Sequence, residues 1–359
     1  MAKSKPSKKT TGTPPPLEIP EPKFNWMNQS RQWGTRVSPG KSGLTLDSLN
    51  VGIYGEVPPR WTDQGRNPRG AIPVKGALPI GYSVTEKIGL WAPMAAELYE
   101  EAIQRRWAPA TDVPWASIQA LPDDVETAIC QVCTEIAQYA NVDIEVLTNW
   151  QHRMSYGYHE VKQFLATASL DAARRYEAFR KRALTNGGGL GLEPMDQVNR
   201  FLLESRGGWT ETVAGIALVR GLFLSTMCEY LFRHSYNDAE RAIYSYVIQD
   251  VSRLIAYGVD HLRYCMARDD EKTSTVATMI AIGLGLMARD LRDPVLREAL
   301  AIVFGGGIAG ARREGMSVFL DFLEDFRERH VALRRWLNLP GDAMSMPRAF
   351  RPREPRQAR

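Results

Sequence analysis

The sequence lacks the marks of a secreted or membrane-spanning protein. Only four of its 359 residues are cysteine, too few for the disulfide framework of a small extracellular domain. Residues 1–12 are basic and polar with no apolar core behind them, so no signal peptide is expected. The longest run without a charged residue, 273–288, is shorter than the ~20 apolar residues of a membrane span. We therefore expect a cytoplasmic protein without membrane contact.

Recognisable metal-binding patterns are also scarce. The chain has five histidines, and none has Asp or Glu three residues before it, so no Glu-x-x-His motif is present. Cys130 and Cys133 are spaced as in zinc or redox sites. They lie inside an apolar helical pattern with no second cysteine pair nearby, which favours two buried thiols.

Charge and proline divide the chain into three parts. Residues 1–80 hold twelve of the 22 prolines and twelve Lys and Arg against five Asp and Glu. We expect the first fifteen or so to be disordered and 20–80 to be an extended arm along a partner, because large aromatics are uncommon in disordered tails. A wholly disordered arm is the alternative. Residues 81–336 are acidic overall and form the body, and 337–359 form a second basic extension.

The body shows helical periodicity throughout. Asp123 with Glu126, and Asn237 with Glu240, have the spacing of capping boxes at helix starts. An apolar stripe over 91–107 precedes the longer helices. The predicted helices cover about 123–150, 158–184, 210–233, 237–268, 273–289, 294–303 and 313–336. Two consecutive helical hairpins predict an all-α fold, an antiparallel four-helix bundle core with extra helices.

Two similar segments lie near the middle of the second helix of each hairpin. Asp171-Ala-Ala-Arg174-Arg175 and Asp250-Val-Ser-Arg253-Leu254 both contain Asp-x-x-Arg. They resemble the paired Asp-Glu-x-Arg-His segments of the ferritin-like di-iron carboxylate superfamily, which includes bacterial multicomponent monooxygenase hydroxylases and ribonucleotide reductase small subunits. The Asn-Gly-Gly-Gly stop at 186–189 is similar too. The resemblance covers about residues 86–270 and implies a ferritin-like bundle.

The resemblance also predicts where metal ligands would lie, and this chain has other residues there. In such bundles each of two helices supplies one Glu, and each of the other two supplies Glu-x-x-His. The six corresponding positions are Val142, Ala172, Arg175, Arg220, Val251 and Leu254. Iron needs imidazole and several carboxylates, so we expect no metal, no cofactor and no catalytic residue at this vestigial site.

The retained Asp and Arg residues correspond to groups that orient ligands in the resembled family. Without the ligands, we expect Asp171, Arg174, Asp250 and Arg253 to form a structural ion-pair network between helices. Buried arginines need carboxylate partners. Asp171 or Asp250 are the expected partners of the arginines at 175 and 220.

Two classes of function remain open. The first is a non-catalytic subunit that stabilises an active di-iron oxygenase or oxidase, in a hetero-oligomer with a paralogous ferritin-like chain contacted partly by the N-terminal arm. The alternative is an O₂-dependent monooxygenase or oxidase with displaced ligands among Glu135, Glu145, Glu160 and Glu229. Nucleic-acid binding through the basic extensions is disfavoured, because the body is acidic and the extensions lack a basic helix.

Overall fold

The computed structural model describes residues 19–62, 66–78, 81–194, 196–339, 346–347 and 350. The chain forms two compact units, residues 1–36 and 37–359. In the first unit, a short 3₁₀ turn covers Asn25–Asn28. There Trp26 meets Trp33 edge to face, with ring centroids 6.3 Å apart.

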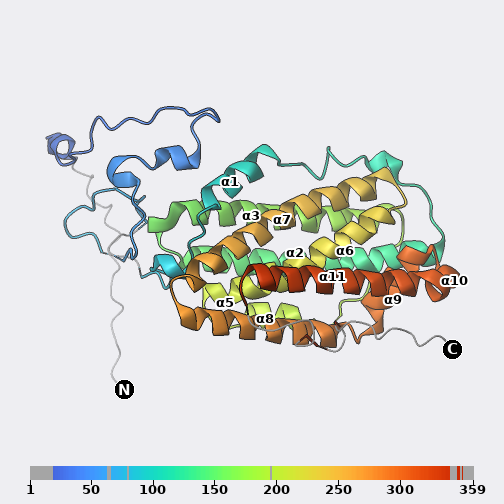
Figure 1. The fold of residues 1–359 in the computed structure, drawn as a ribbon. Coiled ribbons are helices and arrows are strands. Elements are labelled where there is room, and N and C mark those ends of the chain that lie inside the picture. Colours follow the sequence, from blue (N-terminus) through green and yellow to red (C-terminus); the bar gives the residue numbers. More distant parts are fainter. Residues whose placement is uncertain are drawn as a thin grey trace, which may run out of the picture. The chain divides into compact units, whose positions relative to one another are not determined.

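The second unit is helical. Its described part contains no β-strand beyond isolated bridges, and the predicted all-α bundle with extra helices is confirmed (Figure 1). The helices are α1 (Ala95–Gln104), α2 (Asp123–Arg153), α3 (His159–Thr185), α4 (Gln197–Glu204), α5 (Trp209–Val213), α6 (Leu222–Arg233), α7 (Asp238–Met266), α8 (Asp270–Asp290), α9 (Pro294–Gly305), α10 (Ile308–Gly310) and α11 (Met316–Trp336). Two π-helical segments, Ala214–Gly221 and Ala311–Gly315, precede α6 and α11.

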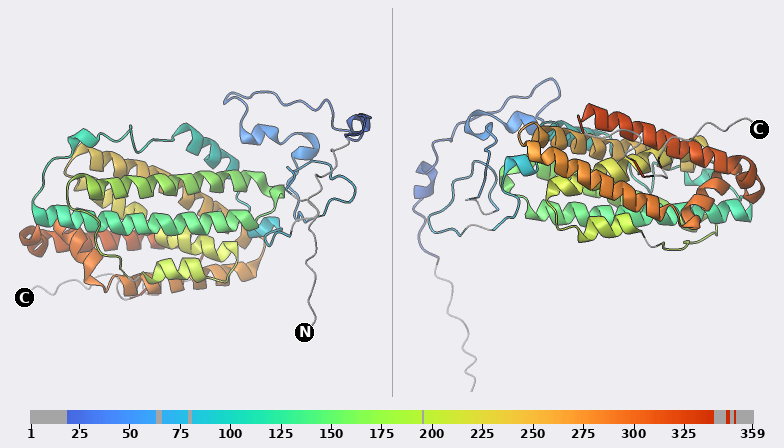
Figure 2. Two further views of the ribbon diagram at one scale, coloured as in Figure 1. Left: turned by 180° about the vertical axis from the view of Figure 1, so that it is seen from behind. Right: turned by 60° about the horizontal axis from the view of Figure 1, so that its bottom comes forward.

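Helices α2 and α3 form the first antiparallel pair (Figure 2). Glu126, near the start of α2, is bonded to Arg182 near the end of α3 at 2.7 Å. At the opposite end, the Gln151 side chain donates to the Lys162 carbonyl at 2.8 Å. The two helices therefore run in opposite directions, as in a helical hairpin.

The second hairpin packs on the first in the same way. The rings of Phe164 and Tyr257 stack with centroids 4.9 Å apart, while Arg182 and Glu240 are bonded at 2.7 Å, so α3 and α7 are antiparallel. Helix α7 also packs on the π-helical segment Ala214–Gly221, where a Cβ on Gly258 would lie 2.5 Å from that of Ala217. Only a glycine allows this close approach of the two helices.

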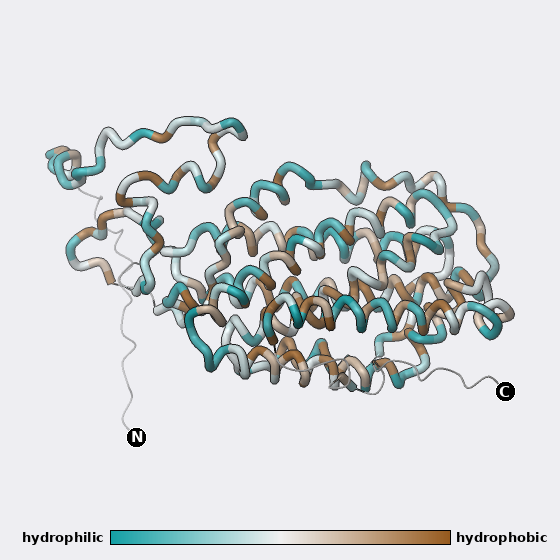
Figure 3. Tube along the Cα trace, viewed as in Figure 1, coloured by the Kyte–Doolittle hydropathy of each residue, from teal (hydrophilic) through white to brown (hydrophobic). Residues whose placement is uncertain are grey.

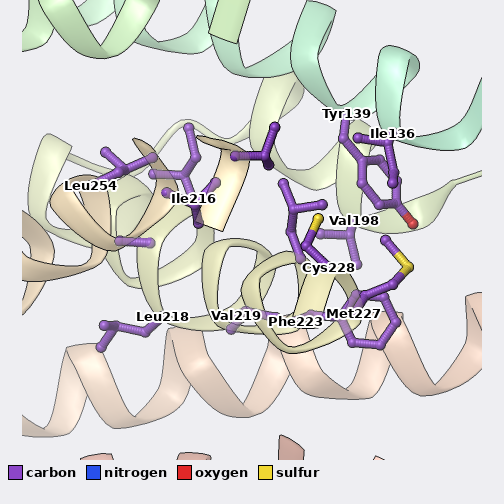
Figure 4. Packing of buried hydrophobic residues seen from close by; sticks show 14 of the residues in the cluster. Ile136, Tyr139, Val198, Ile216, Leu218, Val219, Phe223, Met227, Cys228 and Leu254 are labelled. Carbon is purple, nitrogen blue, oxygen red and sulfur yellow. The ribbon is translucent and has the colours of Figure 1, made fainter. Parts of the chain in front are cut away.

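The core follows from the apolar spacing of the long helices (Figure 3). The continuous helical stretch Trp209–Arg233 is apolar enough by length and composition to span a membrane, but 89% of its apolar window is buried inside the protein. Figure 4 shows its residues Ile216, Phe223 and Cys228 among core side chains that include Tyr139 of α2 and Leu254 of α7. This stretch is therefore the central helix of the core.

Three local predictions can be compared with the structure. The capping box at Asp123 is wrong, because no side chain caps α2, and Glu126 is buried against Arg182. The one at Asn237 is confirmed in part, since its side chain accepts the Glu240 N–H at 2.9 Å. All four cysteines are free and buried, as expected. Helix α4 was not predicted.

Part of the proline-rich segment packs on the bundle. Arg69 is buried and bonded to the Glu160 carboxylate of α3 at 2.7 and 3.0 Å. The ring of Trp61 lies so close to Gly157 that a Cβ there would approach it to 2.4 Å. Residues 37–78, where described, thus belong to the same unit as the helices. The boundary placed at residue 80 stays a prediction.

Arg182 tests how much the buried ion pairs stabilise the bundle. Its guanidinium bonds both Glu126 and Glu240 and is 1% exposed. We expect Arg182→Met to lower the free energy of unfolding by about 3–5 kcal/mol, because two carboxylates stay buried without their cation. Urea unfolding measures this change. Arg180→Met, at an exposed position of the same helix, is the control and should change it by less than about 0.5 kcal/mol.

Candidate functional site

The six predicted ligand positions lie on α2, α3, α7 and the π-helical segment Ala214–Gly221. All six predicted positions are buried. The centre of the site is Asp143, whose carboxylate forms an ion pair with Arg175 of α3. The other Asp143 oxygen lies 3.4 Å from Arg220 of the π-helical segment. Two of the six positions therefore converge on one carboxylate, which lies beside Val142.

Arg220 has two further contacts besides Asp143. It donates to the side-chain oxygen of Asn199 on α4. Its guanidinium carbon lies 4.5 Å from the centroid of the Tyr139 ring, within the range of a cation–π interaction. The π-helical turn shifts the register of the helix around this residue. An arginine that is 1% exposed is thus satisfied without reaching solvent.

The remaining positions form an apolar wall. Ala172, Val251 and Leu254 are 1%, 2% and 7% exposed, and Val142 is 7% exposed. A Cβ on Gly221 would lie 3.7 Å from Val251, so the α7 side of the site borders the residue after Arg220. Hydrocarbon side chains provide no metal ligand on this side.

The four retained residues form a reciprocal network, as predicted. Arg174 pairs with Asp171 on its own helix and with Asp250 at 3.3 Å. Arg253 pairs with Asp250 on its own helix and with Asp171 at 2.8 Å. The Trp107 indole N–H also donates to Asp250 at 2.9 Å. Burial and the neighbouring Asp250 charge raise the pKa of Asp171 to about 6.

The predicted partners of Arg175 and Arg220, Asp171 or Asp250, are wrong. Asp171 and Asp250 pair with Arg174 and Arg253, while Arg175 and Arg220 share Asp143. Asp143 was missed because the resemblance directs attention to position 142, one residue earlier. Burial raises the pKa of the Asp143 carboxyl, and the two arginines oppose that shift.

These residues do not fit a di-iron cofactor. The site offers one carboxylate, and two guanidinium groups occupy its surroundings, where they would repel a divalent cation. Across the described residues, no group of three or more His, Cys, Asp and Glu side chains is placed to hold a metal ion. The donor set is that of an internal ion-pair network.

The four glutamates considered as displaced ligands lie apart. Glu160 is bonded to Arg69, and Glu229 to Arg329 at 2.6 Å. Glu145 is exposed on α2. Glu135 is 4% exposed and accepts the Tyr139 hydroxyl at 2.9 Å. The four do not form one site.

Glu135 lines a small cavity of about 30 Å³, room for about one water molecule, beside Asp196, Asp290 and Arg220. Its second carboxylate oxygen, Oε2, has no hydrogen-bond partner among described groups. Burial and the Asp196 charge raise the pKa of Glu135 to about 7. Burial also raises the pKa of Asp290 to about 7, although its carboxylate accepts the N–H groups of residues 197 and 198.

Comparison with known proteins gives a likeness of fold. No family model matches the sequence, and no curated protein matches it. Among solved structures, a point mutant of an R2-like ligand-binding oxidase with aerobically reconstituted Mn/Fe cofactor has 16% identity over 66% of this chain and 92% of its own, with a TM-score of 0.48. Another mutant, anaerobically reconstituted, has 19% identity over 66% and 92%, with a TM-score of 0.49. The oxidase after photoconversion has 16% identity over 70% and 86%, with a TM-score of 0.44.

These low scores assign no activity and no residue role to this chain. The Mn/Fe cofactors are those of the oxidases. The bundle assignment follows from the antiparallel helix pairs described above, with one long crossover between α3 and α5.

Asp143→Asn tests whether the centre around Arg175 and Arg220 is held together by charge. The substitution keeps the size of the side chain but leaves two buried arginines without a carboxylate. We expect the free energy of unfolding to fall by about 3–5 kcal/mol, measured by urea titration. Glu145→Gln, exposed on the same helix, is the matched control. An equal small effect of both substitutions would show that the arginines are satisfied without Asp143.

The raised pKa of Glu135 predicts that the free energy of unfolding depends on pH. Because its folded pKa of about 7 lies above the ordinary 4.5, the folded protein keeps a proton that the unfolded chain releases, so this group lowers stability as pH rises between those values. Glu135→Gln should therefore unfold with a free energy higher by on the order of 3 kcal/mol at pH 8. The difference from the natural protein should shrink towards pH 5. Parallel urea titrations at both pH values measure it, and a constant difference would contradict the raised pKa.

Proposed function

We propose that this protein is a non-catalytic, metal-free subunit with a ferritin-like bundle, which pairs with and stabilises an active di-iron oxygenase or oxidase chain. The observation that carries the proposal is the position of Arg175 and Arg220. Both occupy predicted ligand positions and share the Asp143 carboxylate. In this chain, fixed guanidinium groups provide the positive charge that metal ions would bring to such a centre.

The stability of the site without metal supports this role. Clustered ligand carboxylates in a bundle core need cations, since like charges at short range repel. Here none of the six predicted positions carries a carboxylate, and the adjacent Asp143 is paired with two arginines. In the tetrad of Asp171, Arg174, Asp250 and Arg253, two negative charges balance two positive ones. The bundle needs no metal ion to neutralise these groups.

A partner role rests on the surface and the N-terminal segment. The first unit exposes Trp26 and Trp33, at 59% and 62%, in a basic segment. Exposed aromatics of this size are enriched where proteins meet other proteins. A paralogous chain with intact Glu-x-x-His pairs, whose body is acidic like this one, is the partner proposed for them.

Metal content and partner identity test the proposal together. A tagged copy of this chain, purified from its native host, should bring a second chain bearing two Glu-x-x-His motifs, and metal analysis should find iron or manganese in the complex. After separation of the chains, this one should hold well under one metal ion. About two metal ions on this chain alone would favour the alternative, an oxidase with displaced ligands. Elution as a monomer under native conditions would oppose the subunit role.

A repaired variant provides the positive control. Val142→Glu, Ala172→Glu, Arg175→His, Arg220→Glu, Val251→Glu and Leu254→His restore the predicted ligand set. Where circular dichroism shows that the fold is kept, we expect measurable iron binding, because the resemblance predicts that the six positions face one site. Failure to bind iron with the fold intact would mean that these positions do not converge on a metal centre.

A further inference from the structure

A groove on the second unit has not been used by the site above. Residues of α8, α9 and α11 line it together with Pro347, and its volume is about 1090 Å³. Much of the lining is apolar, with Leu291, Ala301 and Phe319 buried. Ile308 and Leu320 line the groove and remain 48% and 37% exposed. An apolar surface of this extent, left open on a soluble protein, is a mark of a binding site.

The charges around the groove have one sign. Four arginines line it against one acidic residue, Glu298; they are Arg289, Arg292, Arg297 and Arg312. None of the four forms an ion pair with any residue that the structure describes. This contrasts with the bundle interior, where Arg175 and Arg182 are both paired. The occupant of the groove is therefore expected to carry acidic groups beside an apolar surface.

The length of the groove suits a short helical segment. Along α11 the groove extends from Met316 to Leu323, which is about 10 Å at the rise of an α-helix. Two turns of an amphipathic helix have this length.

The chain's own extensions are poor candidates for this groove. Residues 1–80 carry twelve Lys and Arg against five acids, and 337–359 carry five Arg against two acids. Pro347 of the second extension lines the groove, but the remainder of either segment would bring positive charge to arginines that have no ion pair among the described residues. The extensions of a second copy carry the same positive charge. The charge of the rim therefore favours an acidic segment over any of these extensions.

We propose that the groove between α8, α9 and α11 binds an acidic amphipathic helix of the partner subunit. The apolar face of that helix would lie on Ala301, Phe319 and Leu320, with its carboxylates beside the arginines of the rim. Helix-in-groove docking of this kind combines apolar anchors at helical spacing with flanking charges. The inference rests on the proposed function for the identity of the partner, whereas the chemistry of the groove follows from its own residues.

The test uses the full-length protein and a defined probe, a fluorescein-labelled stapled helix of about three turns with leucines on one face and glutamates flanking them. We expect fluorescence anisotropy to show saturable binding. A matched probe with lysines in place of the glutamates should bind at least about tenfold more weakly. Equal affinity for the two probes would overturn the proposal.

Substitutions in the protein locate the binding. Arg292→Glu with Arg312→Glu should weaken binding of the acidic probe about tenfold or more. Leu320→Asp should weaken it too, by placing a carboxylate on the apolar surface. Arg313→Glu is the matched control, because this exposed residue adjoins Arg312 but does not line the groove. A loss of binding in the control equal to that in the double variant would place the probe elsewhere.

Two further measurements identify a different occupant. Tighter probe binding by a chain that ends at Phe350 would mean that residues 351–359 compete for the groove, which would overturn the choice of a partner helix. Arginine-dependent binding of decanoate without binding of the acidic probe would do the same in favour of a small amphipathic anion. If the chain holds no metal and binds neither helical probe, the proposed function is unaffected and only the docking proposal is wrong.

Discussion

Balance of buried charge is the constraint on which this bundle depends. A guanidinium taken out of water needs carboxylates and hydrogen bonds around it. The chain meets that need with ion pairs between different helices: Arg182 joins α3 to α2 and α7, and Arg253 joins α7 to α3. Each pair fixes the register of two helices at one level. The levels follow one another along the bundle, so the helices cannot slide without separating charges.

This arrangement favours a unique packing more than it adds stability. Replacing a buried ion pair by apolar residues of similar volume is often neutral or stabilising, whereas removing one partner is costly. The tetrad of Asp171, Arg174, Asp250 and Arg253 shows the logic, because each carboxylate contacts both arginines. A helix shifted by one turn would separate the two pairs between helices, Arg174 with Asp250 and Arg253 with Asp171, and leave only the pairs within each helix. The network thus penalises alternative alignments of two similar hairpins.

The sequence predicted much of the fold and part of the site. Apolar spacing located the long helices, and two Asp-x-x-Arg segments predicted the tetrad, because repeated spacing on paired helices places the same groups opposite each other. Asp143 could not be assigned as the partner of Arg220, since a π-helical turn shifts the register before α6. The local capping signal at Glu126 failed because a distant arginine, Arg182, competes for the same carboxylate. The groove joins α8, α9 and α11, and no short-range pattern predicts such a junction.

The centre formed by Asp143 and the six predicted ligand positions is asymmetric. On the α2 and α3 side it keeps charge, with Asp143 between two arginines, while on the α7 side Val251 and Leu254 are hydrocarbon. A guanidinium is charged at any pH at which the protein is folded, so Arg175 and Arg220 need a carboxylate wherever the helices place them. Asp143 meets that need for both, and it thereby ties the register of α2 to that of α3 and of the segment before α6.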